Sequence, residues 1–278
     1  KKFKYPGIRH RCYRDSIVGS FFVSLMIFIH HMLGTWKNKV SAYIVLTDFQ
    51  KHKMIKEGLP LEKCIVKPNF VEEITEKDIC HDNIDLNLKT KPYCLFIGRL
   101  SDEKGVHVAL NAWARFKANK DLNSSSFNYK FYIIGDGPQK KHLNTLSCKL
   151  GIESSVVFLG HRNKQFINWI TRDSSFLIFP SLLYETFGLT ALEAGLHGVP
   201  SLISEPTTTS GLFRDRQTAV LFPMGDVEDL SNAISHAFAN PVFMQSIGNN
   251  AKRLVKKEYS SEENLKCLLQ IYKQVIGK

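Results

Sequence analysis

Hydrophobic and polar residues in the second half of the chain alternate between two patterns. Short apolar runs are followed by longer stretches in which apolar residues recur every three or four positions. The runs predict buried strands, and the stretches predict amphipathic helices. Predicted strands lie at 93–97, 131–134, 156–159, 176–179, 199–203 and 219–222. Helical stretches separate them in every case but the last, which predicts an α/β fold with a parallel, doubly wound sheet covered by helices on both faces.

The chain divides into regions where this alternation begins and ends. Before it lie a predicted strand at 41–46, a helical stretch that stops at Gly58 and a short strand at 64–66. Residues 67–92 mix acidic and apolar residues and end at a proline, as linkers between domains often do. After the alternation come helical stretches with no strand between them. We expect an incomplete first domain at 1–66, a linker at 67–92, a complete domain at 93–256 and a C-terminal helix at 257–278.

The apolar stretch at 17–29 follows a basic run that starts with Lys1. It is shorter than the roughly 20 residues that a membrane-spanning helix needs. A signal peptide would match its charge and length, but no small-residue cleavage site follows it. Two interpretations remain: a buried helix of an incomplete domain, or a helix that contacts a membrane. Because the chain starts with Lys1 and not with Met, we expect it to be a fragment of a longer protein.

Composition limits the classes of protein to which the chain can belong. With 44% hydrophobic residues among 278 it can bury a sizeable core, which excludes general disorder. It has 37 Lys and Arg against 26 Asp and Glu, a formal net charge of +11. No RNA- or DNA-binding motif accompanies these charges, so we expect no nucleic-acid partner. The basic N-terminus predicts instead an attraction to an anionic membrane surface or to a lipid-phosphate acceptor.

The six cysteines are scattered and form no C-x-x-C pair or short cluster. Their spacing is not that of a metal site. Isolated cysteines in a chain of this length are typical of reduced packing residues in the cytosol. The sequence therefore predicts a cytoplasmic protein.

A glycine-bounded turn follows the first predicted strand of the complete domain. It runs from Gly98 to Gly105 and carries two cations, Arg99 and Lys104. A guanidinium and an ammonium in one turn can bind the same diphosphate, one as a planar fork and the other as a point charge. An ordinary surface loop with solvated charges is the alternative. A similar turn at Gly135 is weak evidence by itself, because a lone G-x-G also occurs in plain strand-to-helix turns.

The strongest signal lies in residues 181–195, which follow a predicted strand and read SLLYETFGLTALEAG. Thr186 is predicted to cap the N-terminus of a helix, since its hydroxyl can accept from a free N–H group of the first turn. The helix should stop at Gly198 and Pro200. This segment therefore forms a strand–loop–helix unit at the carboxyl edge of the sheet, where doubly wound folds bind their ligands.

Two glutamates in this segment are too far apart for a close acid/base pair. Glu185 would stand just before the helix and Glu193 about two turns inside it, and eight residues of helix span about 12 Å along the axis. The two carboxylates are spaced instead to bind separate parts of one long ligand. Phosphates of that ligand would lie at the helix N-terminus near Gly188 and Leu189, where free N–H groups and the helix dipole favour anions.

This combination of motifs resembles a known family. The E-x7-E spacing of Glu185 and Glu193, set in Ser-x-x-x-Glu-x-Phe-Gly-x-x-x-x-Glu-Ala, together with the turn at 98–105, is similar to the retaining GT-B glycosyltransferases of family four, the glycosyl transferases group 1. The resemblance runs from about Ser41 to the C-terminus. One departure is the loop at 205–214, which reads EPTTTSGLFR where family members often have a glycine-rich, acid-bearing loop.

The resemblance implies an architecture of two Rossmann-like domains. Residues 93–256 would be the complete C-terminal domain, which binds the nucleotide-sugar donor. Residues 1–66 would be the C-terminal part of the N-terminal domain, which supplies the acceptor pocket. The last helix, at 257–278, would return to the N-terminal domain.

The resemblance also implies roles for single residues. Arg99 and Lys104 would bind the donor diphosphate, Glu193 would accept hydrogen bonds from the ribose hydroxyls, and Glu185 would lie beside the donor sugar. The stretch from Gly160 to Lys164 would pass near the nucleobase. The expected catalytic residues are Glu185, Arg99 and Lys104. The expected donor-binding residues are Gly98, Arg99, Lys104, Gly135, Gly160, His161, Arg162, Glu185, Thr186, Phe187, Gly188, Leu189 and Glu193.

The motifs and the resemblance together predict a retaining glycosyltransferase of hexosyl or N-acetylhexosaminyl type. It would move a sugar from a nucleotide-diphosphate sugar to a polysaccharide, glycolipid or other glycan acceptor, at the inner face of the cell membrane. No D-x-D metal motif stands in a credible position, so side-chain cations and helix N–H groups would stabilise the leaving diphosphate without a metal or other cofactor. The alternatives are a nucleotide-sugar epimerase of GT-B architecture and a nucleotide-sugar-binding half without transfer activity.

Overall fold

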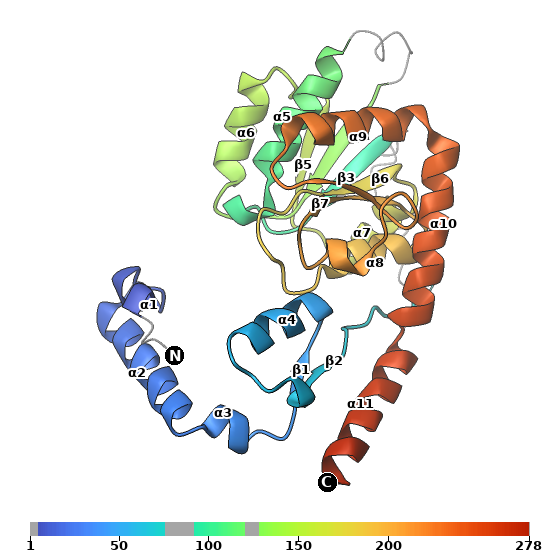
Figure 1. Ribbon diagram of the computed structural model, residues 1–278. Helices are drawn as coiled ribbons and strands as arrows, with labels where there is room; N and C mark the ends of the chain where they lie inside the picture. Colours follow the sequence, from blue (N-terminus) through green and yellow to red (C-terminus); the bar gives the residue numbers. More distant parts are fainter. Residues whose placement is uncertain (1–4, 76–91, 120–127, 278) are drawn as a thin grey trace. The chain divides into compact units, whose positions relative to one another are not determined.

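The computed structural model describes residues 5–75, 92–119 and 128–277 and divides the chain into two compact units (Figure 1). One unit comprises Lys1–Lys67 and Leu268–Lys278, and the other comprises Pro68–Cys267. Most of the predicted linker at 67–92 lies outside the described residues, as do Lys1 and Cys80. The roles assigned to the regions 1–66, 67–92, 93–256 and 257–278 stay predictions.

The smaller unit contains a two-stranded parallel sheet. Strand β1 (Tyr43–Val45) pairs with β2 (Cys64–Val66), and helix α4 (Asp48–Lys56) connects them. Thr47 caps α4, because its hydroxyl accepts from the backbone N–H of Gln50. Both strands and the helix predicted from the sequence are confirmed. The helices before them are α1 (Tyr5–Arg9), α2 (Ile17–Met32) and α3 (Thr35–Asn38).

Helix α2 buries two small side chains and leaves most of its large apolar side chains exposed. Ser16 caps it by accepting from the N–H of Gly19 at 3.0 Å, and its buried residues are Ser20 and Ser24. The helix is thus confirmed, but none of its apolar side chains is fully buried and seven of them are exposed. The exposed ones are Ile17, Val18, Phe21, Phe22, Met26, Ile29 and Met32. Within the described ranges, no helix has both the length and the apolarity required to cross a bilayer.

The larger unit contains a six-stranded parallel sheet in the order β5-β4-β3-β6-β7-β8. This confirms the predicted doubly wound α/β fold. The order reverses direction between β3 and β6, so right-handed crossovers place α5 and α6 on one face of the sheet and α7 and α8 on the other. The strands are β3 (Tyr93–Ile97), β4 (Lys130–Ile134), β5 (Val156–Gly160), β6 (Phe176–Phe179), β7 (Ser201–Glu205) and β8 (Val220–Pro223).

Helices follow the strands as the periodicity predicts, and helices close the chain. Helix α5 contacts both α6 and α9, while α8 contacts α10. The helices are α5 (Val106–Ala118), α6 (Lys140–Lys149), α7 (Lys164–Arg172), α8 (Leu189–Leu196), α9 (Val227–Ala239), α10 (Pro241–Glu258) and α11 (Ser261–Ile276). The strand expected at 199–203 is shifted to β7, because Pro200 lacks the N–H group that a central strand would donate.

A cluster of aromatic side chains fills the core between the sheet and helices α5 and α9. Trp113 of α5 is fully buried and its ring contacts those of Phe116, Phe131 and Phe238. Its indole N–H donates to the hydroxyl of Ser155 at 3.0 Å, which satisfies the one polar group of the side chain. This packing gives β3 and β4 a rigid support, and the loops that follow these strands inherit their positions from it.

Candidate functional site

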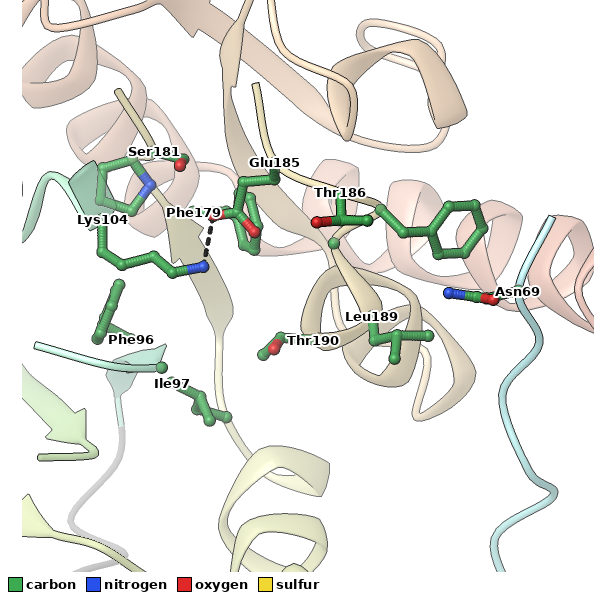
Figure 2. A pocket seen from close by; sticks show the side chains of 14 residues that line it. Asn69, Phe96, Ile97, Lys104, Phe179, Ser181, Glu185, Thr186, Leu189 and Thr190 are labelled. Carbon is green, nitrogen blue, oxygen red and sulfur yellow. Dashed lines mark hydrogen bonds and ion pairs between the residues drawn. The ribbon is translucent and has the colours of Figure 1, made fainter. Parts of the chain in front are cut away.

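A cavity of about 210 Å³ lies at the carboxyl ends of β3 and β6, beside the N-terminus of α8 (Figure 2). The sheet reverses its strand order between these two strands, and open α/β sheets bind ligands at that point. The cavity is lined by Asn69, Phe96, Ile97, Gly98, Lys104, Phe179, Pro180, Ser181, Glu185, Thr186, Phe187, Gly188, Leu189 and Thr190.

A larger cavity, of about 610 Å³, lies at the amino ends of the strands. Its lining includes Ser174 and Pro200, which precede β6 and β7, together with Arg172 and His197. Size alone would favour this cavity. We select the smaller one because the ligand site of a doubly wound sheet lies at the carboxyl ends of its strands.

Two of the residues that line the smaller cavity form an ion pair. Figure 2 shows the Lys104 ammonium and the Glu185 carboxylate joined by this contact, and Nζ and Oε1 are 2.8 Å apart. Lys104 ends a 3₁₀ turn, Asp102–Lys104, and Glu185 belongs to the loop between β6 and α8. The two side chains are 28% and 13% exposed. Because both side chains are partly buried, salt screens their attraction less than that of a fully exposed surface pair.

The loops that carry these two charges are bound to each other through their backbones. The carbonyl of Glu103 accepts from the N–H of Leu182 at 2.8 Å and from the Ser181 hydroxyl at 3.2 Å. Gly105 has a φ of +66°, and a Cβ at this position would lie 1.9 Å from the carbonyl oxygen of Pro180. Only glycine permits both this conformation and this approach. The backbones that carry Lys104 and Glu185 are therefore held close together, within reach of the ion pair that the two side chains form.

Helix α8 begins without the side-chain cap that the sequence predicts. Gly188 precedes its first residue, adopts a left-handed conformation (φ +87°) and makes no side-chain cap. The prediction that Thr186 is the N-cap is therefore wrong. A Cβ on Gly188 would lie 2.2 Å from the Thr209 hydroxyl, so the loop after β7 packs directly against this turn. The first-turn residues Leu189 and Thr190 line the cavity.

The helix N-terminus gives the cavity a second source of positive potential. The first N–H groups of a helix have no partner within it, and the dipole adds partial positive charge there. Leu189 in this first turn lines the cavity and is 41% exposed. An anion between Lys104 and this end of the helix would interact with both the ammonium and the free N–H groups.

Glu193 lies farther along α8 and does not line the cavity. Burial raises the pKa of its carboxyl above the ordinary value; the charge of Lys164 opposes this rise and that of Glu72 adds to it. Lys164 and Glu72 form an exposed ion pair of 2.9 Å. The second glutamate of the E-x7-E pattern therefore stands near the start of α7, apart from the Lys104–Glu185 pair.

Other predicted site residues lie along the carboxyl edge of the sheet, and all of them but Gly98 lie outside the cavity lining. Gly98 donates to the carbonyl of Ile134 at 3.0 Å, and Gly135 donates to that of Gly160 at 2.9 Å, which ties the ends of β3, β4 and β5 together. Arg99 is exposed next to Gly98. His161 and Arg162 are exposed after β5, and the Arg162 guanidinium lies 4.9 Å from the centre of the Phe166 ring.

The structure thus separates the predicted residues into two groups. Those that line the cavity are Gly98, Lys104, Glu185, Thr186, Phe187, Gly188 and Leu189. Those that lie outside its lining are Arg99, Gly135, Gly160, His161, Arg162 and Glu193. Sequence reasoning missed Asn69, Phe96, Ile97, Phe179, Pro180, Ser181 and Thr190. The strand ends were identifiable as positions at the site edge, but Asn69 carries no signal of its own.

No group of three or more His, Cys, Asp or Glu side chains within residues 5–75, 92–119 and 128–277 is arranged to hold a metal ion. The five cysteines in these ranges are free thiols: Cys12, Cys64, Cys94, Cys148 and Cys267. The expectation that the chemistry needs no metal stays a prediction.

Comparison with known proteins connects this site to one family. A family model described as "Glycosyl transferases group 1" matches residues 81–254. An alpha-D-kanosaminyltransferase of Streptomyces kanamyceticus is 24% identical over 243 residues, 85% of this chain and 61% of that protein. An uncharacterized glycosyltransferase of Methanocaldococcus jannaschii is 27% identical over 64% of this chain and 44% of its own length. The chain thus spans about half of the length of these relatives.

Solved structures of similar fold cover most of the chain. A structure of Anabaena HepE in complex with UDP has a TM-score of 0.73 at 20% identity, over 86% of this chain and 64% of that one. A sucrose-phosphate synthase from Thermosynechococcus elongatus has a TM-score of 0.75 at 19% identity, over 97% and 65%. Similarity at this level of identity establishes a shared fold, and it confirms the predicted GT-B architecture.

The close approach at Gly105 can be tested against a matched glycine. Gly151 has the same φ of +66°, but no atom lies within 4 Å of a Cβ built there. Gly151→Ala should cost about 1 to 2 kcal/mol of unfolding free energy, the penalty of a left-handed alanine. Gly105→Ala should cost more, because its Cβ also displaces the Pro180 carbonyl. Urea unfolding followed by circular dichroism measures both, and equal losses would contradict the packing described here.

Proposed function

Because the chain belongs to the glycosyl transferases group 1 family, we propose that it carries the nucleotide-sugar site of a retaining glycosyltransferase of family four. The observation that carries the proposal is the cavity in which the Lys104 ammonium and the start of α8 face the same space. A cation and a helix N-terminus on one cavity are suited to a diphosphate. The activity proposed is the transfer of a hexosyl or N-acetylhexosaminyl group.

The proposed donor is a nucleoside diphosphate sugar. Its diphosphate would lie between Lys104 and the first turn of α8, with the exposed guanidinium of Arg99 as a second cation at the rim. The ribose hydroxyls would donate to Glu193, and the base would lie near Gly160, His161 and Arg162. HepE, which shares the fold, is described in complex with UDP. UDP is therefore the first nucleotide to test.

The proposed reaction replaces the leaving diphosphate at the anomeric carbon by an acceptor oxygen on the same face of the sugar. The bond from the anomeric carbon to the phosphate oxygen breaks, and the bond to the acceptor oxygen forms. The acceptor's proton passes to the departing phosphate oxygen. Negative charge grows on the diphosphate during this step, and preorganised donors at that point lower the barrier. Lys104, Arg99 and the N–H groups of α8 would supply them without a metal ion.

We propose a glycan or lipid-linked acceptor and a cytoplasmic location at the inner face of the membrane. The exposed apolar side chains of α2 support this proposal, as do the basic residues Arg9, Arg11 and Arg14 that precede the helix. Apolar and basic side chains together favour the interface of an anionic bilayer.

Transfer activity and its alternatives can be separated by product analysis. Incubation with donor alone would yield an altered sugar nucleotide from an epimerase. Incubation with donor and acceptor would yield a glycosylated product and a nucleoside diphosphate from a transferase. Donor binding without either product would indicate a binding protein.

The diphosphate contacts can be tested by removing each cation. Lys104→Ala and Arg99→Ala should each weaken UDP binding by roughly 1.5 to 3 kcal/mol, the scale of a hydrogen bond to a charged group. Lys130→Ala is a matched control, because Lys130 starts β4 at the opposite edge of the sheet and donates to the carbonyl of Ser154. Isothermal titration calorimetry measures the affinities. Unchanged UDP affinity in both site variants would place the diphosphate elsewhere.

The ribose contact can be tested through its pH dependence. Because burial raises the pKa of Glu193, this carboxyl takes up its proton at a higher pH than an exposed glutamate. A protonated Glu193 has lost the negative charge with which it would accept from the ribose hydroxyls. UDP affinity should therefore fall as pH is lowered through that pKa. Glu193→Gln should bind UDP more weakly at neutral pH and show a flatter pH profile. The diphosphate's own protonation affects both proteins alike, so parallel profiles would argue against a ribose contact.

A further inference from the structure

Glu185 is the one cavity-lining carboxylate in the described part of the chain, and it is bound to the cation that the proposed ligand needs. Lys104 Nζ lies 2.8 Å from Glu185 Oε1, and the carboxylate is only 13% exposed. A phosphate oxygen that binds the same ammonium would lie about 2.8 Å from Nζ. The two anionic oxygens would then be at most about 5.6 Å apart, in a place that salt screens poorly.

The backbone keeps Glu185 at this position when a ligand binds. Its loop is held to the Lys104 turn by the bond from the Leu182 N–H to the Glu103 carbonyl, and by the contact between Gly105 and Pro180. Its other end is fixed where Gly188 packs against Thr209. The carboxylate can change its rotamer, but the loop cannot move away from the cavity without breaking these contacts.

A free nucleoside diphosphate and a nucleoside diphosphate sugar affect this carboxylate differently. The free diphosphate takes a share of the Lys104 ammonium, brings like charge toward Glu185 and offers the carboxylate no hydrogen-bond donor. A donor sugar brings hydroxyl groups next to the β-phosphate, and these can donate to Glu185 in place of the ammonium. Leaving a buried charge without its partner is costly, whereas exchanging one partner for another is not.

We propose that Glu185 makes the site discriminate against the free nucleoside diphosphate, the product of the reaction, in favour of the sugar-bearing donor. This inference rests on the proposed function, since it assumes a diphosphate at Lys104. It gives Glu185 a role beyond contact with the sugar: the carboxylate lowers product affinity, so it favours product release and limits product inhibition. In each turnover, Glu185 would then exchange the Lys104 ammonium for the hydroxyl groups of the donor sugar, and would return to Lys104 when the product leaves.

The test compares nucleotide affinities of the whole chain and its variants by calorimetry. The probes are UDP, GDP and ADP and the corresponding diphosphate glucoses, and the nucleotide that the wild type binds best is used throughout. Glu185→Gln and Glu185→Ala should each bind the free diphosphate at least fivefold more tightly than the wild type. The ratio of diphosphate Kd to diphosphate-glucose Kd should fall about tenfold.

A matched control separates the ion pair from a general effect of charge. Glu103 is next to Lys104 in sequence, but its carboxylate accepts from the Ser101 hydroxyl. Glu103→Gln removes the same charge and should leave the diphosphate affinity within twofold of wild type. An equal gain in Glu103→Gln, or no gain in either Glu185 variant, overturns the inference. If the wild type binds none of the nucleotides, the proposed function itself fails, which is a different result from wild-type binding without a gain.

Discussion

The site depends on the close packing of loops at the point where the sheet reverses its strand order. The loop after β3 and the loop after β6 meet at Gly105 and Pro180, at a distance that leaves no room for a side chain. The loop after β7 meets the start of α8 in the same way, at Gly188 and Thr209. These contacts are formed by backbone and small groups, so they fix the positions of the loops from which the charged side chains project.

The packing of these loops also determines which charged groups face the cavity. Among the described residues, the cavity combines an ammonium, a helix N-terminus and a single opposing carboxylate, and Lys104 and Glu185 form an ion pair of 2.8 Å between two loops that cannot separate easily. A purely cationic pocket would hold a diphosphate regardless of what is attached to it. A pocket with one built-in anion makes affinity depend on whether the ligand brings hydrogen-bond donors for that anion. Selectivity between related nucleotides can therefore arise from one charge.

Sequence patterns predicted the sheet well because strands such as 93–97 and 176–179 are covered on both faces. Strands of this kind are recognisable in the sequence as nearly continuous apolar runs. They failed where backbone conformation decides the outcome. Thr186 has the chemistry of a helix cap, but Gly188 turns the chain into α8 in a left-handed conformation, so the cap position lies two residues beyond Thr186. The lining by Asn69 was also unpredictable, since it depends on contacts between segments distant in sequence.

We propose that the cavity between β3, β6 and α8 binds the diphosphate of a sugar nucleotide. A crystal structure of the protein with UDP bound tests this directly. We expect phosphate oxygens within hydrogen-bonding distance of Lys104 Nζ and of N–H groups in the first turn of α8. A nucleotide bound instead in the larger cavity beside Arg172 and His197, with Lys104 still paired only to Glu185, would contradict it.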